Sequence, residues 1–184
     1  MECLDTVLVR NILEHAHEYP WRYQDIGLLV LRLDEHREYA LHVWAPERCV
    51  GTPPIHDHPF DFESRIIVGE MTNGRYVEDP AGAKYLRERY SPGNEESRTT
   101  DYVQLSSEFE TFTEGDEYAQ LAAQLHDSHQ LPGTVTIIHR APFLEMAELT
   151  VCRLDEKAAW VSGASRTPTP EDVTDITKQA LTWF

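Results

Sequence analysis

Short apolar runs separated by turn residues fill most of the chain. Residues 26–33 and 39–45 are rich in apolar and aromatic side chains and are joined by a polar turn, which is typical of two paired strands. Residues 134–140 form a β-branched run, and residues 147–155 form the last strand-like run. We therefore predict an antiparallel all-β structure whose core spans about residues 26–155.

The pattern between these runs is less regular. Asn73 and Gly74 lie between two short β-prone runs, and Asn-Gly is the strongest two-residue signal for a hairpin turn. Residues 79–115 contain Pro, Gly and many charges, which predicts a long loop or an extended excursion, with residues 85–90 as a candidate strand. Residues 101–112 alternate and predict a strand. A loop of this length is a lid, a binding loop or a family-specific insertion.

The two ends of the chain have a helical period. Apolar side chains recur every four positions within residues 4–17, which predicts an amphipathic helix. Thr169 followed by Pro170 is a strong helix start, so a second helix is expected over about residues 170–183. Its apolar stripe is expected to dock on the core. A contact between two copies of the chain, which would form a homodimer, is the alternative.

Length and charge narrow the functional classes. The chain has 184 residues, enough for one domain with a sizeable core, so we expect residues 1–184 to form a single domain. Its 32 acidic and 16 basic residues give a formal net charge of −16, which disfavours nucleic acid and anionic membrane as partners. No run reaches the ~20 apolar residues of a membrane span, and the N-terminus lacks the features of a signal peptide. A cytoplasmic location is therefore expected.

Candidate chemistry is concentrated in residues 51–69, which read GTPPIHDHPFDFESRIIVG. His56 and His58 are two positions apart, so they share one face if this segment is extended. Pro59 ends regular pairing, and the turn that follows brings Glu63 back at the start of the next strand. Two imidazoles and one carboxylate would then converge on a divalent metal ion. This ligand combination is typical of non-haem iron.

This segment resembles the first motif of the cupin family, in which His-x-His and a glutamate lie between two glycines. His56, His58 and Glu63 match the core of that motif, and Gly51 and Gly69 each stand one residue closer than usual. The resemblance implies a jelly-roll barrel, also called a double-stranded β-helix, that holds a metal ion in its mouth.

The second cupin motif supplies a third imidazole. Gly115 and His126 keep its glycine-to-histidine spacing, but Leu121, Ala123 and Gln130 stand where Pro, Gly and Asn are usual. The resemblance thus implies a ligand set of three histidines and one glutamate, namely His56, His58, Glu63 and His126.

Three positions keep two interpretations. His139 is the rival of His126, because cysteine dioxygenase-like cupins place their last ligand in a context similar to Ile138-His139-Arg140. Glu63 either ligates the metal or orients a ligand or a water from behind it. His42 shares a strand face with Trp44 and either enters the pocket or lies against the sheet.

A substrate-binding cation is also expected. If Glu63 faces the metal, Arg65 shares that face, because side chains alternate along a strand. A buried guanidinium needs an anionic partner and is well shaped for a carboxylate. Arg65, and after it Arg140, are therefore the candidates that hold a substrate carboxylate.

The expected function is that of a metal-dependent small-molecule enzyme with one divalent ion per chain. Fe(II) is favoured, and would make the protein a mononuclear non-haem dioxygenase or oxygenase that uses O2 and a small substrate bearing a carboxylate or a thiol. Zn, Ni or Mn would act as a Lewis acid in an isomerase, epimerase or lyase. A barrel that binds a small ligand without catalysis is the third alternative, since the cupin fold serves all three roles.

Overall fold

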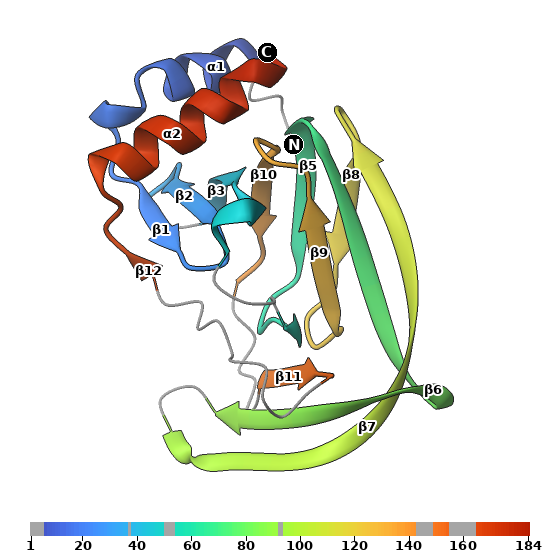
Figure 1. Ribbon diagram of the computed structural model, residues 1–184. Helices are drawn as coiled ribbons and strands as arrows, with labels where there is room; N and C mark the ends of the chain where they lie inside the picture. The colour runs from blue at the N-terminus through green and yellow to red at the C-terminus, as the bar shows by residue number, and fades with distance from the viewer. Residues whose placement is uncertain (1–5, 37, 50–53, 92–93, 143–148, 155–164) are drawn as a thin grey trace.

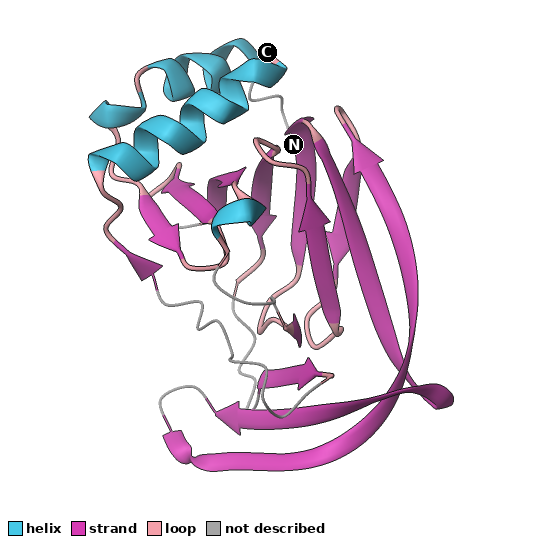
Figure 2. Cartoon of the chain, in the orientation of Figure 1, coloured by secondary structure: helices cyan, strands magenta, loops and turns pink. Residues whose placement is uncertain are grey.

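Two antiparallel sheets enclose the interior of the molecule (Figures 1 and 2). The computed structural model describes the chain except for residues 1–5, 37, 50–53, 92–93, 143–148 and 155–164. Within the described ranges, the first sheet has seven strands, in the order β12 (Ser165–Arg166), β1 (Arg22–Gln24), β2 (Leu28–Arg32), β3 (Tyr39–Trp44), β10 (Val135–Arg140), β5 (Phe62–Val68) and β8 (Glu117–Gln120). The second sheet, counted over the same residues, has five strands, in the order β11 (Leu149–Arg153), β4 (Ile55–His56), β9 (His126–Gln130), β6 (Glu70–Ser91) and β7 (Asn94–Thr113), and β11 also pairs with β6.

The strands from β3 to β10 follow a jelly-roll order. Numbered one to eight along the described chain, the first, eighth, third and sixth (β3-β10-β5-β8) are neighbours in the first sheet. The second, seventh, fourth and fifth (β4-β9-β6-β7) are neighbours in the second sheet. This alternation between sheets is the arrangement of two interlocked Greek keys. The predicted all-β jelly-roll class, with a helix toward each end of the chain, is confirmed.

The first sheet is covered on both faces, which explains its long apolar runs. Leu29 and Leu41 belong to the core cluster that includes the helices. Leu28, Val30 and His42, at alternate positions, line the space between the two sheets. The predicted strands over residues 26–33, 39–45 and 134–140 are present as β2, β3 and β10, and β11 covers part of the strand predicted over residues 147–155. A strand buried on both sides reads as a continuous apolar run rather than as an alternation.

The two predicted helices are confirmed as α1 (Thr6–Glu14) and α2 (Pro170–Ala180). They pack against each other over the first sheet (Figure 1). Thr169 and Asp172 form a complete capping box at the start of α2, and Ile176 is buried, so the apolar stripe of this helix docks within the chain. No helix of the described residues has the length and apolar character needed to cross a lipid bilayer. Three short 3-10 helices complete the helical structure of the described chain: η1 (Ala16–Glu18), η2 (Pro46–Arg48) and η3 (Leu181–Trp183).

The described part of residues 79–115 forms the extended excursion and not the long loop, and the candidate strand over residues 85–90 is part of β6. β6 and β7 pair along nearly their whole lengths and form a ribbon that extends beyond the other strands of the sheet (Figure 1). Arg87 donates to both carboxylate oxygens of Asp101, at 2.9 and 2.6 Å, and to Glu78 at 2.5 Å. Charges that indicated a solvated loop are therefore paired, Arg87 with Asp101 across the two strands and with Glu78 within β6. The expected strand over residues 101–112 is part of β7.

The predicted hairpin turn at Asn73 and Gly74 is wrong. Both residues lie inside β6 and are paired on both sides, with β7 and with β9. A Cβ atom at Gly74 would lie 2.4 Å from Asp127 Oδ1 and 2.6 Å from a ring carbon of Phe109. Glycine is present here because another side chain and a ring approach the backbone closely, and not because the chain reverses direction.

Of the two glycines of the first motif, the structure describes Gly69. Gly51 lies outside the described residues. Gly69 connects β5 to β6 with a φ of +88°, and a Cβ atom there would lie 2.8 Å from the Cα atom of Thr134. A left-handed conformation in such close packing requires glycine.

Candidate metal centre

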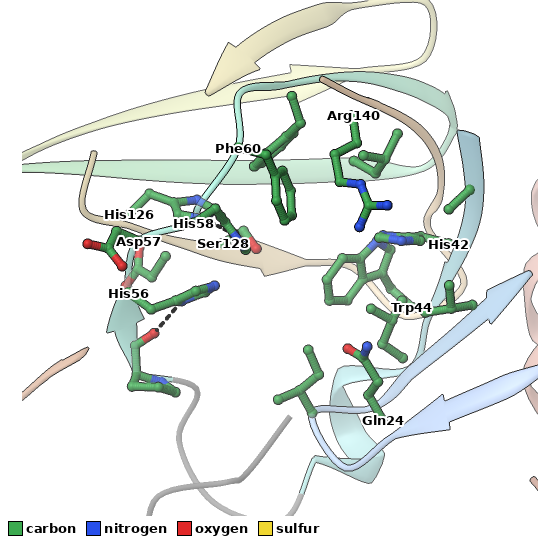
Figure 3. Close-up of a pocket in the computed structure, with 18 of the residues that line it drawn as sticks. Gln24, His42, Trp44, His56, Asp57, His58, Phe60, His126, Ser128 and Arg140 are labelled. Atoms are coloured by element: carbon green, nitrogen blue, oxygen red, sulfur yellow. Dashed lines mark hydrogen bonds between the residues drawn. The ribbon is translucent and has the colours of Figure 1, made fainter. Parts of the chain in front are cut away.

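Three histidines from two distant segments of the chain meet at the inner side of the second sheet. His56 ends β4 and pairs directly with His126, the first residue of β9. Directly opposed residues of an antiparallel pair share a face, so both imidazoles point the same way. His58 follows two positions later, and its ring centroid lies 4.7 Å from that of His56 and 5.0 Å from that of His126. The three rings surround one point (Figure 3).

The spacing of the ring nitrogens fits a single metal ion. The potential ligand atoms of His56, His58 and His126 all lie within 4.8 Å of one another. The Nε2 atoms of His58 and His126 are 3.0 Å apart. Two imidazole nitrogens that bind one ion at about 2.1 Å and at right angles are also separated by about 3.0 Å. The donor set is therefore compatible with one divalent ion bound to three nitrogens.

A chain of amide side chains orients His126. Gln120 Nε2 donates to the backbone carbonyl of Gln124 at 3.1 Å, which identifies its nitrogen, and Gln120 Oε1 accepts from Asn73 Nδ2 at 3.3 Å. Asn73 Oδ1, 3.1 Å from His126 Nδ1, must then be the acceptor, so Nδ1 of His126 carries the proton. The lone pair of Nε2 faces His56 and His58. Such partners fix the tautomer and the ring orientation of a ligating histidine.

His56 is oriented in the same way by the backbone. Its Nδ1 lies 3.0 Å from the carbonyl oxygen of Pro54, which can only accept a hydrogen bond, so Nδ1 donates and Nε2 is left for the centre (Figure 3). Burial lowers the pKa of His56 and, together with the neighbouring histidines, lowers that of His58 well below its usual range. Burial also lowers the pKa of His126 to about 3. The rings are therefore neutral near pH 7, which is the form that binds metals.

Glu63 does not lie with the histidines, and its prediction as a metal ligand is wrong in this structure. Its side chain is 62% exposed on the outer face of β5, where Oε2 lies 3.7 Å from His139 Nδ1. The side chain of β5 that reaches the centre is Phe62, whose ring centroid lies 5.3 Å from that of His58. The face was misassigned because the strand has apolar residues at both odd and even positions, so alternation does not define its inner side.

Arg65 shares the outer face of β5 with Glu63, so the prediction that it lines the pocket is also wrong. It stands opposite Glu117 of β8, and its Nε lies 3.8 Å from Oε1 of that residue. Arg140 does line the cavity, on the side opposite the histidines, with its guanidinium carbon 5.0 Å from the centre of the Phe60 ring. Of the two predicted cations, the structure places only Arg140 where a substrate would meet it.

Of the two candidates for the third imidazole, the structure brings His126 to the cluster and leaves His139 outside it. His139 stacks on Tyr39 with ring centroids 4.5 Å apart, on the outer side of the first sheet beside Glu63. His129 is also separate from the cluster, because its side chain is 64% exposed. Over the described residues, the group that could hold a metal consists of His56, His58 and His126.

A cavity of about 650 Å³ adjoins the three histidines between the sheets. Its walls are largely apolar and include Leu28, Val30, Trp44, Phe62, Met71 and Ile138. Figure 3 shows the histidines on one side of this space and Arg140, His42 and Trp44 on the other. A ligand bound at the histidines would therefore extend across an apolar space toward a second polar group.

Three residues near the site were not placed there by the sequence patterns, or were given two interpretations. His42 lines the cavity, and burial lowers its pKa to about 3. Asn73 was assigned to a turn, and Gln120 was not singled out, yet both are almost completely buried. The sequence signal for both is an amide side chain inside a run that is otherwise strand-like. A buried amide requires hydrogen-bond partners, so such a residue indicates a polar contact inside the protein.

Comparisons with known proteins leave the family unassigned. No protein-family model matches the chain, and no curated protein matches it. Among solved structures, a crystal structure of Drosophila melanogaster CENP-C bound to CAL1 is similar with 13% identity and a TM-score of 0.39, covering 65% of this chain and 75% of that one. A family 16 carbohydrate-binding module has 10% identity and a TM-score of 0.11, covering 73% and 82%. Both scores are too low to carry an argument about function.

Proposed function

We propose that this protein is a cupin-type, metal-dependent enzyme that acts on a carboxylate-bearing small molecule. In this proposal His56, His58 and His126 hold one divalent ion, Fe(II) in the favoured case, and the reaction is an oxygenation by O2. The observation that carries the proposal is the convergence of three imidazoles, without a carboxylate among the described residues, on the wall of a 650 Å³ cavity. The jelly-roll order of the strands supports the cupin assignment.

The donor set limits the choice of metal. Imidazole nitrogens suit Fe, Zn, Ni and Cu, and three of them leave coordination positions open. Iron in such a site supplies one-electron chemistry with O2, whereas zinc supplies a Lewis acid. The absence of a carboxylate among the described donors favours the cysteine dioxygenase-like form of the resemblance over the form with three histidines and one glutamate.

The chain's own residues have three tasks in this proposal. Asn73 holds His126 with its Nε2 toward the ion through the hydrogen bond to Nδ1. Phe60 and Phe62 pack beside His58, with ring centroids at 5.1 and 5.3 Å, and keep water from that side of the centre. Arg140 faces the same cavity and attracts the carboxylate of the substrate.

A second candidate function is Lewis-acid catalysis by zinc, nickel or manganese in an isomerase, epimerase or lyase. Three histidines with a fourth position open are also the ligand set of catalytic zinc sites, and this observation favours the alternative. Oxygen uptake separates the two functions, because only the oxygenase consumes O2. A protein that binds a ligand but no metal would instead be a binding module of the same fold.

The test is metal analysis per chain on protein purified anaerobically without added metal. We expect about one equivalent of iron in the wild type and little in His58→Ala, because metal sites lose their affinity when one of few ligands is removed. His139→Ala is the matched control, since this histidine lies on the outer face. One equivalent of zinc or nickel without O2 uptake would favour the alternative. No metal after reconstitution, or equal metal in His58→Ala, would refute the proposal.

A further inference from the structure

The cavity is much larger than an amino acid requires. Its volume of about 650 Å³ lies in the middle of the range of about 300–1,000 Å³ that holds drug-sized ligands. A single amino acid would fill only part of this cavity. The rest would be left to water molecules, each of which occupies about 30 Å³ in the liquid. Apolar side chains such as Val30, Trp44 and Ile138 form most of the walls. A ligand that matches them must itself be long and largely apolar.

The side of the cavity away from the histidines has a polar character of its own. Figure 3 shows the guanidinium of Arg140 directed into the space between Phe60 and His42. Arg32 and Glu38 line the same cavity, whereas Asp57 and Asp127 line it next to the histidines. Among the described residues, the side away from the histidines thus has two cations and one carboxylate. Counted over the described residues of this side alone, the net charge is positive, although the whole chain carries −16. The local charge therefore favours an anion, and a single negative charge balances it.

His42 supplies a second polar contact at this place. Its ring meets Trp44 edge-on at 5.9 Å, and within the described part of the chain its buried Nδ1 has no hydrogen-bond partner. His42 also lines the cavity, and burial keeps its ring neutral by lowering its pKa to about 3. A neutral imidazole has one N–H donor, which we assign to a ligand oxygen that also contacts Arg140.

We propose that the cavity binds an elongated monocarboxylic acid, with an apolar aliphatic or aromatic body, whose carboxylate lies between Arg140 and His42. The opposite end of this ligand reaches the three histidines, and this part of the inference rests on the proposed function. His42 is then a specificity-determining residue. A doubly charged phosphate fits less well, because Glu38 already offsets one of the two guanidinium charges.

The test measures ligand binding directly, through quenching of tryptophan fluorescence, since Trp44 lies in the cavity wall. Octanoate, acetate and octan-1-ol are titrated into metal-loaded protein and into protein stripped with EDTA. We expect octanoate to bind at least about tenfold more tightly than acetate, because only octanoate covers the apolar walls. Octanoate should also exceed octan-1-ol by about tenfold, because only the carboxylate pairs with Arg140.

Substitutions test whether Arg140 and His42 bind the carboxylate of the ligand. Arg140→Met should weaken octanoate binding by about tenfold or more and leave octan-1-ol unchanged, and His42→Phe should weaken octanoate by about three- to tenfold. Arg65→Met is the matched control, because it removes an arginine from the outer face. Equal affinities for acetate and octanoate, no binding of either acid, or equal losses in Arg140→Met and Arg65→Met would overturn the inference.

The same titrations separate this inference from the proposed function. Octanoate binding that depends on Arg140 in a protein that takes up no metal would support the ligand class and refute the metal enzyme. A protein that binds one equivalent of metal but no octanoate would keep the enzyme and refute the ligand class. His58→Ala, which should lose the metal, is expected to retain the Arg140-dependent binding.

Discussion

The Nε2 atoms of His58 and His126 lie 3.0 Å apart, although the residues are 68 positions apart in the sequence. Nδ1 of His126 carries its proton, because it donates to Asn73. Nε2 of the neutral ring is therefore an acceptor, and His58 donates to it in the protein without metal. For a metal ion to bind at Nε2 of His58, this proton would have to move to Nδ1 of the same ring, which frees the Nε2 lone pair. Metal binding and this hydrogen bond therefore compete.

The orientation of His126 predicts a role for Asn73 in metal affinity. Asn73→Ala removes the acceptor of the Nδ1 proton and should lower the affinity about 10- to 100-fold, as is typical when the partner of a ligating histidine is lost. Asn73→Asp keeps an acceptor and should retain most of the affinity. Competition with a chelating dye measures both. Thr72→Ala, which removes an exposed hydroxyl bonded to Thr111, is the control, and an equal affinity in Asn73→Ala and Thr72→Ala would contradict this role.

The position of Glu63 predicts that its carboxylate is dispensable for metal binding. The side chain is 62% exposed on the outer face of β5. Glu63→Gln should therefore retain the wild-type metal content and change the free energy of unfolding by less than about 0.5 kcal/mol. Metal analysis and urea unfolding measure the two quantities. Loss of metal in Glu63→Gln, at unchanged stability, would return this residue to the ligand set.

Burial of His42 predicts a loss of stability in mild acid. Its pKa is about 3 in the folded protein and 6.5 when exposed, so the unfolded chain binds more protons and stability falls as the pH drops below 6.5. At pH 5 the ring is still neutral in the folded state. The contribution of His42 between pH 7 and pH 5 is then about 2 kcal/mol, set by its unfolded pKa.

Urea unfolding of metal-free protein at the two pH values measures this contribution. His42→Phe should remove about 2 kcal/mol of the pH dependence, while His56, His58 and His126 continue to contribute with the same sign. His17→Gln is the control, because that side chain is 79% exposed. A pH dependence as steep in His42→Phe as in the wild type would show that His42 does not contribute.

Close packing around Gly74 predicts that even one methyl group destabilises the protein. In Gly74→Ala the new Cβ would approach Asp127 and the Phe109 ring to less than 3 Å, and overpacking of this kind costs about 1–3 kcal/mol. Val77→Ala changes an exposed position of the same strand and should have little effect. Thermal or urea unfolding distinguishes the two, and a Gly74→Ala protein as stable as Val77→Ala would mean that β6 can shift at this point.

Local periodicity was sufficient for the elements whose two faces differ in polarity. A helical period located both terminal helices, and the two-residue period of a strand placed His56 and His58 side by side. His126 could not be reached in this way, because its place opposite His56 is a long-range pairing. The glycine-to-histidine spacing of the second cupin motif pointed to it instead.

The remaining errors have one physical origin, which is that strand pairing is not encoded locally. β5 has apolar residues at both odd and even positions, so its inner face was undetermined and Glu63 and Arg65 were placed on the wrong side. Asn73 and Gly74 match a turn by composition but are held extended by strands on both sides. Charges such as Arg87 and Asp101 resemble those of a loop until the ribbon pairs them.

A ligand set of three neutral imidazoles has an electrostatic consequence. A divalent ion bound there brings two positive charges into an apolar cavity, and none of its described donors offsets them. Asp57 and Asp127 line the cavity near His56 and offset part of this charge. An anion that enters the same cavity offsets a further part, even from the Arg140 side, and the ion in turn lowers the cost of removing that anion from water. By thermodynamic linkage, each then raises the affinity of the other by the same factor. If the proposed function holds, the protein would thus hold the metal most tightly when the substrate is present.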